Sequence, residues 1–170
     1  MTQSSYILIY ILVTIGIINP HLVASGNPIV DNVCSRTTFF YYCTHRFMSR
    51  PSSFHADLHK LGDIAIDLAI SDAWRAREKA QEIMNRTRDV VLVGNLKKCR
   101  SAYRSAFVQL RDARRLWAVN NFGAVRQIVY GMFDGVFACR DALGSHERLL
   151  ARNNMAVEYM AHIILVISNY

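Results

Sequence analysis

The fold is decided by residues 96–139, which read LKKCRSAYRSAFVQLRDARRLWAVNNFGAVRQIVYGMFDGVFAC. In each half of this stretch, apolar residues recur at alternating steps of three and four, which is the signature of a helix with one buried face. The pair Asn120-Asn121 interrupts the pattern, so we expect one helix over residues 96–120 and a second over 121–143. The two stripes are Leu96, Cys99, Tyr103, Ala106, Leu110, Ala113 and Trp117, then Phe122, Val125, Val129, Met132, Val136 and Cys139.

The cysteines fit an antiparallel arrangement of these two helices. Cys99 and Cys139 lie about 20 residues on either side of the Asn120-Asn121 link, so folding at the link brings them to the same level. Four cysteines allow three pairings. A Cys99–Cys139 bridge leaves Cys34 and Cys43 to close a local loop, whereas either alternative would tie the N-terminal segment to both helices.

Two further helices are expected on the same evidence, one over residues 57–86 and one over 145–168. Gly94 is interpreted as a helix breaker between residues 88 and 95, and Ser145 as an N-cap. Breaks near Gly94, Asn120 and Gly144 exclude a long coiled-coil rod. The sequence therefore predicts an all-α protein, an antiparallel up-and-down four-helix bundle preceded by a short N-terminal segment.

The first 30 residues contain no Asp, Glu, Lys or Arg, and a 13-residue apolar run extends from Tyr6 to Ile18. This pattern predicts a secretory signal peptide over residues 1–25, cut near Ser25 or Gly26, with the functional domain over 26–170. The alternative is an N-terminal anchor or a buried strand. Export would also make Asn85, in the sequon Asn-Arg-Thr, a possible glycosylation site.

Composition narrows the class of protein. The chain has 170 residues, enough for one domain, and 20 Lys+Arg against 13 Asp+Glu give a net charge of +7. The basic residues of 96–120 are interpreted as a solvated face, or as one that attracts an acidic partner surface or a polyanion. Nucleic acid is not expected as a partner, because export disfavours it and the aromatic residues fall mainly on inward stripes.

No motif of catalysis is present, so we expect no catalytic residue, no cofactor and no metal. His55 and His59 have the spacing of a helical metal pair but lack a third ligand. Asp63 and Asp67 could share a helix face as an acid–base pair, although solvation or pairing with Lys60 is the simpler interpretation.

Several segments resemble one family, the plant invertase and pectin methylesterase inhibitors. The resemblance covers nearly all of the chain beyond the expected signal peptide. Four cysteines at the family's spacing, together with two helix signatures in order, make it specific. The segments are CSRTTFFYYC (34–43), DLHKLG (57–62), IDLA (66–69), CRSAYRSA (99–106), FDGVFACRD (133–141) and HIILVISN (162–169).

The resemblance implies an N-terminal helical hairpin added to the four-helix bundle, and two consecutive disulfides, Cys34–Cys43 and Cys99–Cys139. It implies a protein secreted to the apoplast, with the vacuole as an alternative, that binds no nucleic acid and no membrane once the signal is removed. Members inhibit a target enzyme by a one-to-one complex that covers its substrate cleft. Arg140 departs from the family pattern, in which an acidic residue follows the cysteine.

The target is predicted from one short segment. Invertase inhibitors of this family often carry Pro-Lys-Phe where this chain has Asn120-Asn121-Phe122, so only Phe122 matches. We nevertheless prefer acid invertase (β-fructofuranosidase) as the target, with pectin methylesterase as the alternative and a non-inhibitory exported bundle, similar to pollen allergens or wall-associated, as the third. The expected partner-binding residues are Phe122, Asn121 and Tyr130; for Tyr130 and its neighbours, packing within the bundle is the competing interpretation.

Overall fold

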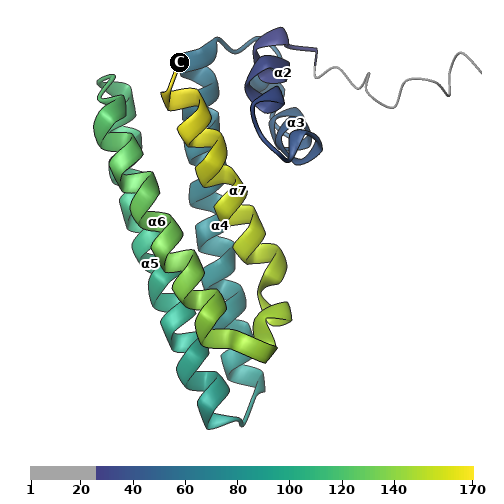
Figure 1. Ribbon diagram of the computed structural model, residues 1–170, viewed down its shortest axis with the longest axis vertical. Coiled ribbons are helices and arrows are strands. Elements are labelled where there is room, and N and C mark those ends of the chain that lie inside the picture. The colour runs from purple at the N-terminus through teal and green to yellow at the C-terminus, as the bar shows by residue number, and fades with distance from the viewer. Residues whose placement is uncertain (1–25) are drawn as a thin grey trace, which may run out of the picture.

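The computed structural model describes residues 26–170, so the expected signal peptide lies outside the described residues. The described chain forms a four-helix bundle with a smaller helical hairpin at one end (Figure 1). This confirms the all-α bundle predicted from the apolar spacing and the hairpin implied by the resemblance.

The hairpin consists of α2 (Pro28–Ser35), α3 (Phe40–Met48) and the 3-10 turn η1 (Pro51–Ser53). Pro28 begins α2, where its missing N–H costs nothing. Asn27 caps that helix by accepting from the Ile29 amide at 2.9 Å, and its side-chain amide donates to the carbonyls of Ser53 and Ala56 at 2.8 and 2.9 Å. One buried residue therefore ties the start of the hairpin to its end.

The bundle consists of α4 (Leu58–Arg86), α5 (Val90–Ala118), α6 (Phe122–Leu143) and α7 (Ala151–Ser168). Each helix packs against two others, in the ring order α4, α5, α6, α7, and the hairpin rests against α7 and α4. Asp57 caps α4 by accepting from the Lys60 amide at 2.7 Å, and Asp89 caps α5 by accepting from the amides of Val91 and Leu92.

Two helix starts differ from the sequence prediction. Helix α5 begins at Val90 rather than 96, because Asp89 supplies a cap and Gly94 lies within the helix, where a Cβ would meet nothing within 4 Å. Helix α7 begins at Ala151 rather than 145. The 3-10 segment η2 (Gly144–Leu149) occupies the intervening residues, so Ser145 caps no α-helix.

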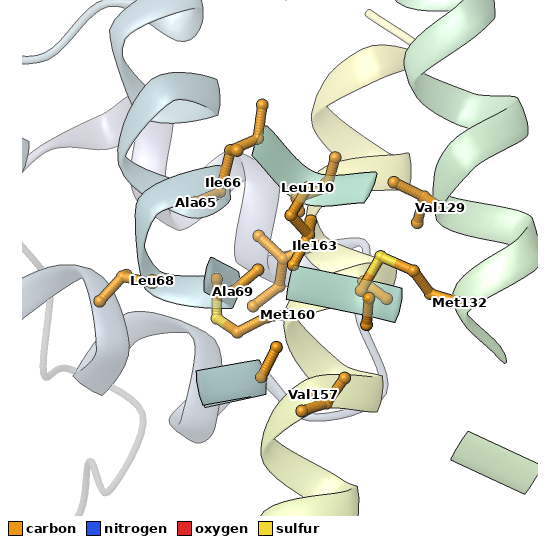
Figure 2. Close-up of a cluster of buried hydrophobic side chains, with 14 of the residues drawn as sticks. Ala65, Ile66, Leu68, Ala69, Leu110, Val129, Met132, Val157, Met160 and Ile163 are labelled. Atoms are coloured by element: carbon orange, nitrogen blue, oxygen red, sulfur yellow. The ribbon is translucent and has the colours of Figure 1, made fainter. Parts of the chain in front are cut away.

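Small residues on α4 allow the larger side chains of the other helices to meet in the centre. Ala65 and Ala69 face Leu110 of α5 and Met160 of α7 within one continuous apolar core (Figure 2). Because alanine projects so little, a long helix can pack closely along its whole length against its neighbours.

Disulfides Cys34–Cys43 and Cys99–Cys139 are both formed, with Cα–Cα distances of 5.5 and 4.5 Å. The first closes the hairpin and the second joins α5 to α6, as expected. Next to the second bridge, the buried Tyr103 hydroxyl donates to Oδ1 of Asn154 on α7 and lies 3.4 Å from the Cys139 sulfur. One polar cluster thus joins three of the four bundle helices.

A buried ion pair joins the hairpin to the bundle. Arg46 of α3 contacts the Asp72 carboxylate of α4 at 2.6 Å, and Asp72 is almost fully buried. Burial raises the pKa of Asp72, and the guanidinium of Arg46 opposes that rise. Leaving the carboxylate without this partner would cost several kcal/mol, about 3 or more, so the pair holds the hairpin in one orientation.

Candidate functional site: the outer faces of the bundle

The link between α5 and α6 lies at the same end of the bundle as the C-terminus (Figure 1). Asn120 has a φ of 57°, the left-handed conformation that commonly ends a helix. The amide of Asn120 donates to the carbonyl of Trp117 and that of Asn121 to the carbonyl of Leu116, both at 2.9 Å. Asn121 then caps α6, because its side chain accepts from the Ala124 amide. Both asparagines therefore have defined structural roles.

Phe122, the first residue of α6, is half-buried rather than presented at the tip. Its ring packs on Trp117 with centroids 4.6 Å apart and approaches the ring of His59 on α4 at 6.4 Å. The Trp117 indole donates in turn to the carbonyl of His59 at 3.0 Å. The three rings close this end of the bundle. The stripes of α5 and α6 predict that Trp117 and Phe122 face inward, but they do not reveal the contact with His59 on α4.

An aromatic stripe lies on the outer face of α6, defined here as Tyr130, Phe133 and Phe137. Tyr130 is 54% exposed and Phe137 39% exposed, while Phe133 is half-buried. The stripe borders a groove of about 660 Å³ that His162 and Leu165 of α7 line on the other side. The Phe133 and His162 rings lie 4.7 Å apart. Phe133 therefore packs within the fold, whereas about half of the Tyr130 side chain is exposed, and its contact with a partner stays a prediction.

Aromatic contacts continue from this groove to the hairpin. The Phe39 ring stacks on Tyr159 of α7 with centroids 4.1 Å apart and lies 6.0 Å from His162. Tyr42 of α3 meets the same Tyr159 ring edge-on at 5.1 Å. The hairpin therefore packs against α7, the helix that forms one wall of the groove.

The groove also carries charge. Arg140 lies over the Phe137 ring at 4.9 Å and reaches the Glu158 carboxylate of α7 at 3.7 Å. The arginine that departs from the family pattern thus has two partners here. Asp134 lines the groove and is exposed. The face presents exposed aromatic area with charges at its rim, the usual composition of a protein–protein contact.

The candidate catalytic and metal residues do not form a site. Asp63 contacts Lys60 at 3.7 Å and Asp67 contacts Arg114 at 2.8 Å, so each carboxylate has a cation as partner. His59 packs on Trp117, as described above. Among residues 26–170, no group of three or more His, Cys, Asp or Glu side chains is placed to hold a metal ion. No helix in this part of the chain is long and apolar enough to span a membrane.

These features define a class: a helical bundle held by disulfides, with a rigid aromatic face and no cluster of reactive groups in its described part. The family model of plant invertase/pectin methylesterase inhibitors matches residues 28–169. The chain therefore belongs to this family.

Comparisons with individual proteins agree with this family assignment. The chain is 23% identical over 142 residues to pectinesterase inhibitor 2 of Arabidopsis thaliana, and the match covers 82% of each chain. Its fold is similar to a crystal structure of a mutant form of a pectin methylesterase inhibitor from Arabidopsis, with a TM-score of 0.72 at 23% identity, covering 82% of this chain and 95% of the other. Another crystal structure, of a pectin methylesterase inhibitor from Arabidopsis thaliana, gives a TM-score of 0.63 at 21% identity and covers 84% of this chain and 95% of the other.

Proposed function

We propose that this protein is a secreted inhibitor of pectin methylesterase, which it blocks by forming a one-to-one complex over the substrate cleft. The observation that carries the proposal is the family match over residues 28–169 on a rigid bundle. The relative named above is a pectinesterase inhibitor. The comparisons support this target better than the acid invertase preferred from the sequence.

The geometry of the α5–α6 link also weakens the expectation of invertase. The preference rested on Phe122 in the place of a Pro-Lys-Phe segment, but Phe122 is half-buried against Trp117. Asn120 stands where that segment has proline, and its φ is 57°. Because the proline ring holds φ near −65°, the link here has a different shape from one built on proline.

Tyr130 is the residue on the aromatic stripe that we assign to the enzyme contact. Binding energy in protein complexes concentrates in a few aromatic and arginine side chains, and Tyr130 offers the largest exposed ring on this face. It is carried by a helix that Cys99–Cys139 joins to α5, so little conformational entropy is lost when a partner binds it.

The test is a titration of the purified, oxidised protein into plant pectin methylesterase and, separately, into plant acid invertase. We expect pectin methylesterase activity to fall in proportion to added protein up to about one equivalent, with invertase unaffected. Loss of invertase activity alone would show that acid invertase, the target preferred from the sequence, is the correct one. No loss of either activity would leave the third alternative, a non-inhibitory exported bundle.

A matched pair of variants tests the contact. We expect Tyr130→Ala to weaken inhibition by at least tenfold, since a central aromatic contact contributes about 2 kcal/mol or more. Tyr41→Ala is the control, because Tyr41 is 57% exposed but lies on α3 in the hairpin. Equal inhibition by the two variants would remove Tyr130 from the interface.

A further inference from the structure

A second face of the bundle lies along the seam between α4 and α5. Its cations come from α5, which carries seven Lys or Arg residues and Asp112 as its one acid apart from the capping Asp89. We define the basic seam as Lys97, Arg100, Arg104 and Arg111 of α5, together with the rings of Phe107 on α5 and Trp74 on α4. All four cations are at least partly exposed.

The cations of the seam are regularly placed. Lys97, Arg104 and Arg111 are seven residues apart, which is two helical turns, so they recur on one face about every 10 Å. The line is therefore about 20 Å long, and shallow hollows of about 210 and 410 Å³ lie along it. Such a row matches a linear partner with repeated negative charge better than a single small anion.

Within residues 26–170, ion pairs do not neutralise the charge of the row. The carboxylates of Glu78 and Glu82 on α4 pair with cations of α4 itself, Arg77, Lys79 and Arg86. Across the part of the chain that the structure describes, no ion pair involves Lys97, Arg104 or Arg111. Arg100 donates to the uncharged side chain of Gln81.

Two aromatic rings lie among these cations, whereas the aromatic residues of the α5 stripe, Tyr103 and Trp117, are buried as expected. Trp74 is 45% exposed, and its ring lies 5.6 Å from that of Phe107. Arg77 lies over Trp74 at 4.8 Å and Arg111 over Phe107 at 6.0 Å. Phe107 and Arg111 are four apart on α5, but Trp74 belongs to another helix, so the sequence of α5 alone hides this pairing.

We propose that the basic seam binds a linear polyuronate, an unesterified acidic polysaccharide whose carboxylates meet the cations and whose sugar rings lie against Trp74. The row supplies the charge complementarity, and the exposed indole supplies an apolar surface for a ring face. The choice of a polyuronate over other polyanions rests on the proposed function, because de-esterification of pectin exposes carboxylates. The inhibitor would then be retained where its target has acted.

The binding test uses the oxidised protein alone, without enzyme, and polygalacturonate of defined length in a calorimetric titration. We expect binding that weakens steeply as salt is added, because the polymer releases counterions on binding. The fully methyl-esterified polymer, which has the same backbone without charge, should not bind. Absence of binding to polygalacturonate would overturn the proposal.

Two charge variants locate the site. We expect Lys97→Gln/Arg104→Gln to weaken binding roughly tenfold and to reduce its salt dependence. The matched control is Arg50→Gln/Arg148→Gln, which removes the same charge from exposed positions in the hairpin link and in η2. Equal weakening in both pairs would show that net charge alone attracts the polymer, and the seam would be refuted.

The variant Trp74→Ala tests whether the partner is a polysaccharide rather than another polyanion. It should weaken binding to polygalacturonate several-fold and leave binding to polyaspartate, which has no sugar rings, unchanged. If single-stranded DNA binds as tightly as polygalacturonate and shows the same dependence on Trp74, the partner class is wrong.

Measuring polymer binding and enzyme inhibition separately distinguishes failure of the polyuronate proposal from failure of the inhibitor proposal. Inhibition of pectin methylesterase by the Lys97→Gln/Arg104→Gln variant is expected to equal that of the unmodified protein, since the seam lies on α4 and α5 and the stripe on α6. Inhibition without polymer binding would refute the polyuronate site alone. Polymer binding without inhibition would refute the inhibitor proposal and leave the seam in place.

Discussion

Gly62 of α4 lies directly beneath the indole of Trp117 of α5, so closely that a Cβ at position 62 would be 1.9 Å from Cζ2 of the ring. The ring is held there by its hydrogen bond to the His59 carbonyl and by its contact with the Phe122 ring. The absence of a side chain at one residue therefore sets how α4, α5 and the start of α6 meet.

Gly62→Ala is expected to destabilise the protein by about 1–3 kcal/mol, because the large ring has to shift or the helices have to separate. Chemical denaturation followed by circular dichroism measures the change. Gly94→Ala is the matched control, also within a helix but with nothing within 4 Å of the added Cβ. Gly94→Ala should raise the free energy of unfolding by up to about 1 kcal/mol, since alanine favours a helix more than glycine does. Destabilisation by both variants to the same extent would contradict the packing argument.

The left-handed residue at the α5–α6 link gives a second prediction. Asn120→Ala should cost about 1 kcal/mol, because a Cβ disfavours a φ of 57°, whereas Asn120→Gly should be neutral or stabilising. Thermal unfolding of the two variants tests the difference in sign. If alanine and glycine at position 120 gave the same melting temperature, this backbone conformation would be absent in solution.

The spacing of apolar residues in the sequence predicts most of the four-helix bundle. A buried helix face requires apolar residues at steps of three and four, so the stripes ending at Trp117 and Cys139 predict both helices and the level of the Cys99–Cys139 bridge. The ends of the helices are harder to predict. Asp89 acts through only two hydrogen bonds to backbone amides, and Gly94 through a small difference in helix propensity. The start of α7 was missed since residues 144–149 form a 3-10 helix instead.

The surfaces were harder to predict than the core. The half-burial of Phe122 agrees with its place on the apolar stripe. The exposure of Tyr130 depends on how α6 sits against α7, and the approach of the Phe122 ring to His59 involves a residue that is distant in the sequence. Such contacts between helices leave no periodic signal in either segment. The resemblance supplied the hairpin and the class of target, which the apolar pattern alone did not contain.

The hydrogen bond from Tyr103 to Asn154 gives a prediction about stability, because a buried polar group that loses its partner destabilises the folded protein. Tyr103→Phe removes the donor and leaves the Asn154 oxygen buried without its partner, which should cost about 1–3 kcal/mol. The double variant Tyr103→Phe/Asn154→Leu removes both polar groups and should recover part of that loss. Additive losses in a double-mutant cycle would show that the two residues are not coupled.

The tyrosines predict how stability changes at alkaline pH. Burial raises the pKa of Tyr42 from 10.0 to about 12, with a smaller contribution from the nearby Asp72 carboxylate, and burial also raises the pKa of Tyr103. The unfolded chain loses these protons near pH 10, while the folded protein retains them. The stabilising contribution of each raised pKa is therefore complete below pH 10 and decreases as pH rises toward the folded value.

We accordingly expect the free energy of unfolding to fall between pH 10 and about 12, and Tyr42→Phe to make that fall smaller. Rapid denaturant titrations across this range measure the effect, and the ultraviolet absorbance of phenolate follows the ionisation directly. Tyr130→Phe is the control, because Tyr130 is exposed. If Tyr42→Phe and Tyr130→Phe gave the same pH dependence, Tyr42 would be accessible to water in solution. The packing of α3 against α7, which places its hydroxyl 3.4 Å from the Ala156 carbonyl, would then be wrong.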